Sequence, residues 1–428
     1  MRRPAFFTGL LLLAAMGADG DEAFGAILDG RVAWEDVIAL AQRDRANAAL
    51  WARICAAGAE RVPPEPRERL RRLAMVAAFR QGRLEARLGA ALDALAAEGI
   101  PVLLLKGAAL AAGVYGSFAQ RPMADLDLMV PAERAAAAHR RLRAGGWVPA
   151  EGTEGALDAL YAAHHHLAPL LDAEGSGVVL EVHVQPLPPG HPFAFGAAEM
   201  WRDAVPVRLG GRVALAPSPP HQLLHLCLHF AWAHALRSGA WRTLRDVRTL
   251  AAQAPPDWTA FAALARETRG ASCAWWTLRL ARGLMDAAVP PRVLDDLRPR
   301  LPDAAARGLE RHFAATLFGC ADCPSPWLQR RLWEMAIRPG AHRHGPARPW
   351  LRDAEFTAAG VAPADRHVDL HVRRRRPSLQ DRGRRRDLAA LRPGPAGGRR
   401  PADPRRRSTA ADHRLGGDGP ARGLQEHG

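Results

Sequence analysis

Apolar residues recur at every third or fourth position in the two outer parts of the chain. In the first part, this spacing runs through residues 70–95, after a break at Pro63-Pro64, and it is typical of amphipathic helices. In the second part, it extends from residue 219 to residue 337, with breaks at Pro255-Pro256 and Pro290-Pro291. We therefore predict two helical regions, at residues 1–98 and 216–339.

Between these regions the pattern changes to short apolar runs. Residues 99–105 read GIPVLLL and residues 124–130 read ADLDLMV, and both are typical of buried strands. Residues 167–171 and 178–185 are two further predicted strands, and the EGSG sequence between them favours a hairpin turn. The sequence predicts an α+β fold, in which residues 99–215 form a core with a small mixed sheet, flanked by the helical regions.

The last part of the chain, residues 340–428, has no apolar periodicity and is rich in Arg, Pro and Gly. Such a segment buries too little apolar surface to fold. One hypothesis is a disordered basic tail that contacts nucleic acid or acidic surfaces. The other is a frameshift in a GC-rich gene, because off-frame reading of such DNA yields this composition.

The net charge of the whole chain is +15, which suggests an acidic partner, but this charge is unevenly distributed. Residues 366–428 hold 17 arginines against seven acidic residues and account for +10 of that charge. The remaining residues carry only +5. We expect nucleic acid as a partner only through this tail.

The five cysteines are too scattered for a disulfide framework, and Cys320 and Cys323 form a lone CxxC pair. Free thiols in the cytoplasm are therefore expected. Arg2-Arg3, followed by the apolar residues 6–16, resembles a signal peptide, but a first buried helix is the preferred interpretation. The run is too short to span a bilayer, so we expect a cytoplasmic protein without a membrane partner.

Two aspartates occupy one face of the predicted strand at residues 124–130. Side chains alternate along a strand, so Asp125 and Asp127 share a face while Leu126 and Leu128 take the other. Two carboxylates side by side on a buried strand are unfavourable unless a cation compensates them. Oxygen ligands suit Mg²⁺ or Mn²⁺, and one of these is the predicted cofactor.

A third carboxylate lies on the later strand, in VLEVHVQ at residues 179–185. Glu181, His183 and Gln185 share one face of this strand. If the strand lies beside the aspartate strand, Glu181 completes a cluster of three acidic ligands. Such a cluster suits two-metal phosphoryl transfer, in which one metal activates a hydroxyl and the other holds a triphosphate.

Lys106 is the only lysine in the chain, whereas there are 58 arginines. It precedes Gly107 between a predicted strand and a predicted helix, where backbone N–H groups favour anions, and its compact charge suits a phosphate. The alternative is chance retention of a single lysine. Arg121 could bind the triphosphate or brace the aspartate loop through a salt bridge.

The stretch PVLLLKGAAL, followed by RPMADLDLMV, resembles the uncharacterised nucleotidyltransferase family, a branch of the polymerase-β-like superfamily. The later sequences LEVHV and HQLLHLCLH are similar to further parts of this family, and the resemblance spans roughly residues 8–290. It implies metal-binding roles for Asp125, Asp127 and Glu181, and a nucleotide-contacting turn at Lys106-Gly107.

The resulting hypothesis is a metal-dependent enzyme that moves a nucleoside monophosphate from an NTP to an acceptor hydroxyl, with release of pyrophosphate. The acceptor stays open among a small molecule, a protein side chain and a tRNA end. The alternative is a non-catalytic nucleotide- or partner-binding protein that retains the fold.

Several polar residues have no assigned role. His221, His225 and His229 line one helix face, where helix packing or contact with the cleft is expected rather than metal binding. One of the three histidines at residues 164–166 could reach the cleft, although such a run is more often exposed to solvent. Asp246, on a predicted helix, is left without a role.

Overall fold

The computed structural model describes residues 21–150, 163–237, 239–318 and 325–337, together with Gly9 and Leu12. All of them belong to one compact unit, Met1–Val368. The apolar run at 6–16 (apart from Gly9 and Leu12), the CxxC pair and the basic tail from residue 340 lie outside the described residues.

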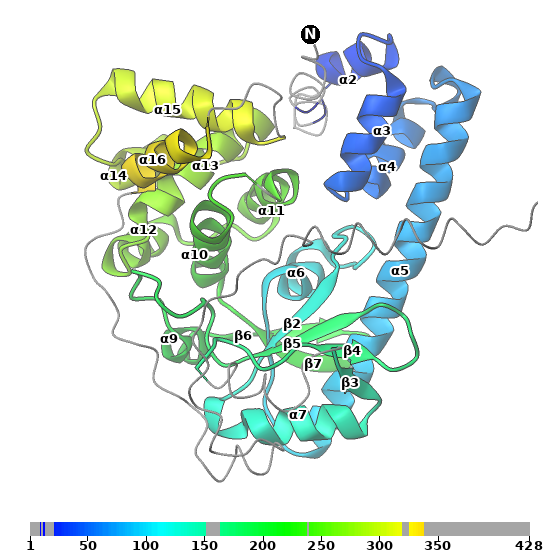
Figure 1. Cartoon of the computed structure of the whole chain (residues 1–428), viewed down its shortest axis with the longest axis vertical. Helices are drawn as coiled ribbons and strands as arrows, with labels where there is room; N and C mark the ends of the chain where they lie inside the picture. Colours follow the sequence, from blue (N-terminus) through cyan, green and yellow to red (C-terminus); the bar gives the residue numbers. More distant parts are fainter. Residues whose placement is uncertain are drawn as a thin grey trace, which may run out of the picture. The chain divides into compact units, whose positions relative to one another are not determined.

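A seven-stranded mixed sheet forms the centre of the described fold (Figure 1). Its strand order is β3-β4-β5-β2-β1-β7-β6. The β2–β5 and β1–β7 pairs are parallel and the others are antiparallel. This confirms the predicted α+β class. The strands are β1 (Leu103–Leu104), β2 (Asp125–Met129), β3 (Trp147–Pro149), β4 (Leu170–Asp172), β5 (Val179–His183), β6 (Val205–Leu209) and β7 (Arg212–Ala216).

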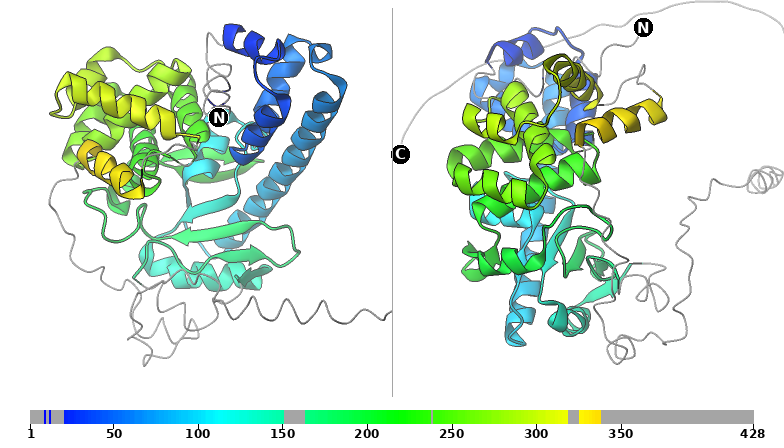
Figure 2. Two further views of the ribbon diagram at one scale, coloured as in Figure 1. Left: turned by 45° about the horizontal axis from the view of Figure 1, so that its top comes forward. Right: turned by 90° about the vertical axis from the view of Figure 1, so that its left-hand side faces the viewer.

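Helices precede and follow the sheet along the chain, as the apolar spacing predicts. Those before or within the sheet region are α2 (Asp21–Leu28), α3 (Trp34–Arg43), α4 (Asn47–Ala57), α5 (Pro64–Ala97), α6 (Lys106–Leu110), α7 (Ala135–Ala144) and α9 (Ala197–Arg202). Those after it are α10 (Pro219–Leu228), α11 (Ala240–Gln253), α12 (Trp258–Glu267), α13 (Ala271–Met285), α14 (Pro291–Leu297), α15 (Asp303–Thr316) and α16 (Pro326–Ile337). Figure 2 shows α3 and α4 beside the first half of the long helix α5.

Each face of the sheet buries its own apolar cluster, because side chains alternate along the strands. Leu126, Leu128 and Leu180 pack with residues of α5 and α7 on one face. Leu103 and Met129 point to the opposite face and join a cluster that continues into α10–α16. The predicted inward face of the aspartate strand is therefore confirmed, and its carboxylates are left on the other side.

Two features of the sheet region are instructive. The predicted hairpin after residue 167 is confirmed, since β4 and β5 pair antiparallel around the glycine-containing turn. The β6–β7 hairpin was not predicted as two strands, although Gly210 and Gly211 mark its turn with φ angles of 51° and 83°.

Among the helices that the structure describes, none combines the length and the apolar character needed to cross a membrane.

Candidate active site

The carboxylates meet because β2 and β5 are neighbouring parallel strands. Their register pairs Asp125 with Val179 and Asp127 with Glu181. The adjacency on which the predicted three-carboxylate cluster depends is therefore present. Asp127 is only 3% exposed, whereas Asp125 lies at the accessible start of β2.

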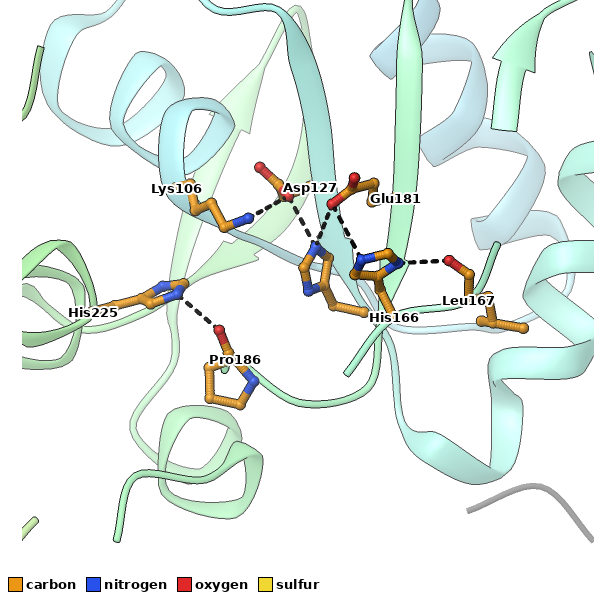
Figure 3. Close-up of polar contacts among 8 residues, drawn as sticks. Lys106, Asp127, His166, Leu167, Glu181, Pro186 and His225 are labelled. Carbon is orange, nitrogen blue, oxygen red and sulfur yellow. Dashed lines mark hydrogen bonds and ion pairs between the residues drawn. The ribbon is translucent and has the colours of Figure 1, made fainter. Parts of the chain in front are cut away.

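Lys106 places its ammonium group on the buried aspartate. Its Nζ lies 2.8 Å from Oδ1 of Asp127, and Figure 3 marks this contact with a dashed line. The backbone helps to fix this contact, because the Leu105 N–H donates to the Asp127 carbonyl at 3.0 Å. Lys106 itself has a φ of 45°, which is uncommon for a residue with a side chain and suggests a constrained position.

His183 makes the second contact to Asp127, a role that the sequence did not reveal. Its Nε2–H donates to Oδ1 of Asp127 at 2.9 Å and lies 3.3 Å from Oε2 of Glu181. Its ring is completely buried, and Nδ1 has no hydrogen-bond partner among the described residues. The alternation of side chains along the strand, which places His183 on the same face as Glu181, could have indicated this role.

These contacts set the protonation of the acidic groups. Burial alone would raise the pKa of Asp127, but Lys106 and His183 outweigh it and hold that pKa well below its usual range. Burial is likewise outweighed at Glu181, where the hydrogen bond from His183 lowers the pKa. At Asp125, desolvation and the neighbouring charge of Asp127 raise the pKa.

The cluster has the composition of a divalent-cation site. One ligand atom from each of Asp127, Glu181 and His183 lies within 4.8 Å of the others. Asp125 opens onto the same cavity. Lys106 and His183 both contact Asp127, as expected for a buried carboxylate, which needs positive charge nearby. The residues present therefore fit a bound metal ion.

A cavity of about 380 Å³ lies in front of the carboxylates. Arg45 and Arg242 also line it, and neither has an ion-pair partner within the described part of the chain. The pKa of Arg242 is lowered by burial and by the charges of Arg121 and Arg45. A cavity lined by both carboxylates and unpaired arginines suits a metal-bound polyphosphate.

Arg121 lines this cavity but is held by α11. Its Nε and Nη2 donate to the Asp246 carboxylate, with an Nη2–Oδ2 distance of 2.6 Å, and the Tyr115 hydroxyl donates to the same carboxylate at 2.9 Å. Gly107 makes room for this arrangement, because a Cβ there would lie 2.8 Å from Nη1 of Arg121. Asp246 thus acquires the role of a buried anchor for Arg121.

Two of the three histidines spaced at four-residue intervals, His225 and His229, belong to the cavity wall, and burial lowers the pKa of both. His221 instead contacts Ser218 Oγ at 2.9 Å. Burial lowers the pKa of His225 to about 3, and its Nε2–H donates to the Pro186 carbonyl at 3.0 Å. The positive charge of the cavity therefore comes from arginine and lysine.

Of the histidines at 164–166, His166 is the one that reaches the carboxylates, and at 8% exposed it does not face solvent. The segment pairs with the end of β5, since Leu167 N–H donates to the Val182 carbonyl at 2.8 Å and Val184 N–H to the His165 carbonyl at 2.8 Å. This pairing turns the rings inward, toward His183. His166 Nδ1–H donates to the Leu167 carbonyl, leaving Nε2 3.9 Å from Glu181 (Figure 3).

A mixed sheet that presents carboxylates from two neighbouring strands to a basic cavity is an arrangement typical of nucleotidyltransferases. The sequence model of a family described as "Uncharacterised nucleotidyltransferase" matches residues 30–286. That match covers more than half of the chain, and the protein belongs to this family. Neither a curated protein nor a solved structure gives a significant match. Family membership points to nucleotidyl transfer as the general reaction class.

Proposed function

We propose that the protein is a metal-dependent nucleotidyltransferase, which moves a nucleoside monophosphate from an NTP to an acceptor hydroxyl. The observation that carries this proposal is the register of β2 and β5, which places Asp127 beside Glu181. Asp125 precedes them on the same face, and all three line the cavity of about 380 Å³.

In this reaction, the acceptor hydroxyl oxygen forms a bond to the α-phosphorus. The bond from that phosphorus to the bridging oxygen breaks, and pyrophosphate leaves with the electron pair. The hydroxyl proton passes to a nearby carboxylate. We assign this role to Glu181, because it lines the cavity and is ionised at neutral pH.

The proposed cofactor is Mg²⁺ or Mn²⁺, held by Asp125, Asp127 and Glu181. When bound, it would neutralise charge on the phosphates and favour ionisation of the acceptor hydroxyl. His183 orients the Asp127 carboxylate through its 2.9 Å hydrogen bond, as a positioning residue.

The triphosphate is proposed to lie along the basic part of the cavity. Lys106 and Gly107 border this part, and Arg45 and Arg242 supply guanidinium groups that form no ion pair within the described part of the chain. Arg121 is paired with Asp246, so we assign it mainly to positioning. Its remaining surface toward the cavity permits an additional phosphate contact.

Calorimetric titration of the full chain with ATP, GTP, CTP and UTP, with and without Mg²⁺, tests this proposal. We expect Mg²⁺-dependent binding of at least one nucleotide, lost when Asp125→Asn and Asp127→Asn are combined. The matched control is Asp296→Asn, which neutralises an exposed carboxylate on α14. Binding that survives in the double variant would contradict the proposed site.

The contact between Lys106 and Asp127 also favours a second candidate, a non-catalytic nucleotide-binding protein, because an ammonium ion already compensates the carboxylate. The two candidates differ in turnover. Incubation with α-labelled NTP and a mixture of potential acceptors yields labelled product and pyrophosphate only for the enzyme. Metal-dependent binding without either product would favour the second candidate.

A further inference from the structure

A second cavity, of about 440 Å³, adjoins the carboxylate cavity. The two share Arg45 and Ala124 in their walls. Ala124 directly precedes Asp125, and another wall residue, Val178, directly precedes β5. Since Asp125 pairs with Val179, this second cavity lies beside the start of both carboxylate-bearing strands.

One wall of this second cavity is a single face of α5. Leu73, Ala77, Arg80 and Leu84 line it, at the three- and four-residue spacing of one helix face. The Ser176-Gly177 turn also lines the cavity, and Gly177 has a φ of 71° with open space where a Cβ would lie. The cavity therefore combines an apolar floor with room near the backbone.

The charge of this cavity is entirely positive. Arg45, Arg80 and Arg83 line it, and no aspartate or glutamate does so within the described part of the chain. None of these three arginines has an ion-pair partner among the described residues.

Unpaired arginines that line a cavity with apolar walls are typical of a site for an anionic ligand. Guanidinium groups bind phosphate through paired hydrogen bonds. A volume of about 440 Å³ is within the range of small-molecule sites. Leu73, Val76 and Leu84 offer contacts to a carbon skeleton.

We propose that this second cavity binds the acceptor, and that the acceptor is a small phosphate monoester carrying a free hydroxyl. This inference rests on the proposed nucleotidyl transfer at the adjoining carboxylates. Arg80 and Arg83 hold the phosphate of the acceptor, and its hydroxyl extends past Ala124 toward Asp125. The hydroxyl oxygen then bonds to the α-phosphorus as pyrophosphate departs, and the acceptor's own phosphate stays intact.

The test uses glycerol 3-phosphate as the probe and glycerol as its neutral counterpart. Affinities are measured by calorimetry on the full chain at fixed ionic strength. Arg80→Gln and Arg83→Gln each remove one charge from the cavity while keeping much of the side chain. Arg72→Gln is the matched control, since Arg72 lies on the same helix, is exposed and does not line the cavity.

We expect glycerol 3-phosphate to bind, glycerol not to bind, and each cavity variant to lose about tenfold in affinity. The control variant should bind like the wild type. The proposal is overturned if the wild type does not bind the probe, if both cavity variants bind it unchanged, or if Arg72→Gln weakens binding equally. Binding of an RNA 3′-end oligonucleotide instead of the probe would also overturn it.

Nucleotide titrations on the same variants separate this inference from the proposed function. Arg80→Gln and Arg83→Gln should leave ATP affinity unchanged, because neither residue lines the carboxylate cavity. Normal ATP binding without probe binding would refute the acceptor site alone. Probe binding that needs Arg80 and Arg83, without binding of any NTP, would refute the proposed nucleotidyl transfer.

Discussion

Replacement of the single lysine offers a sharp test of the site. Lys106→Met keeps most of the length of the unbranched side chain but removes its charge. Asp127, which is 3% exposed, would then retain only the hydrogen bond from His183 at 2.9 Å. Removing one partner of a buried ion pair costs about 3–5 kcal/mol. Because His183 remains, we expect a loss of about 3 kcal/mol in the free energy of unfolding at neutral pH.

The pH dependence of this loss follows from the depressed pKa of Asp127. A carboxyl whose pKa is lower in the folded state stabilises the fold above its unfolded pKa, and this contribution disappears as the pH falls through the folded value. Lys106 is a main cause of that depression. The difference between the wild type and the variant should therefore be largest at neutral pH and shrink under acidic conditions.

A divalent cation should partly replace the lost ammonium group. In the variant, no lysine competes for Asp127, so Mg²⁺ should stabilise Lys106→Met more than it stabilises the wild type. Saturation at a hundredfold excess over Kd adds about 2.7 kcal/mol. Urea unfolding with EDTA or with Mg²⁺ measures both effects, and Lys106→Arg serves as the variant that keeps the charge.

The reasoning would be refuted by a variant whose free energy of unfolding stays within about 0.5 kcal/mol of the wild type in EDTA. A stabilisation by Mg²⁺ that is equal in the two proteins would show that Lys106 and the cation do not share Asp127. Retained stability in Lys106→Arg would indicate that charge, rather than the shape of lysine, is what Asp127 requires.

Three further predictions concern other parts of the fold. Gly107→Ala should lower the free energy of unfolding by about 1–3 kcal/mol, since its Cβ would lie 2.8 Å from Arg121, whereas Gly308→Ala, in open space on α15, should raise it by about 1 kcal/mol in the same urea titration. Equal effects would exclude crowding at Gly107. His183→Leu removes the hydrogen bond that orients Asp127, so it should weaken Mg²⁺ binding and Co²⁺ binding, the latter followed by visible absorbance, by a similar factor of about tenfold; a much larger loss for Co²⁺ than for Mg²⁺ would show that the imidazole is itself a ligand. Burial lowers the pKa of His139 to about 4, so between this value and the ordinary pKa of histidine the unfolded state binds a proton that the folded state does not. The free energy of unfolding therefore decreases as the pH falls through this range, by about 1.4 kcal/mol per pH unit. His139→Gln should flatten that slope, and an unchanged slope would contradict its assignment to His139.

Local patterns predicted much of the carboxylate geometry. The alternation in ADLDLMV correctly placed Leu126 and Leu128 in the core and the aspartates on the opposite face. The same period predicted that Glu181 and His183 share a face. The sequence alone does not determine the order of strands in the sheet, so it could not predict that these two strands are neighbours. The structure shows that they pair in parallel.

The arginines that line the cavity could not be predicted from such local patterns. Arg45 follows α3 and Arg242 belongs to α11, so their approach depends on tertiary packing between distant segments. With 58 arginines in the chain, residue type alone singled out neither. Lys106 stood out only because lysine is otherwise absent, and its contact with Asp127 could not be inferred from that rarity.

The ion pair between Arg121 and Asp246 spans 125 residues and is almost entirely buried. It connects the loop before β2 to α11, the helix that also carries Arg242. A change at either end would leave an unpaired charge in the interior, so the two halves of the protein have limited freedom to evolve separately. Across the family, positions 121 and 246 should therefore vary together, exchanging charge partners or becoming neutral as a pair.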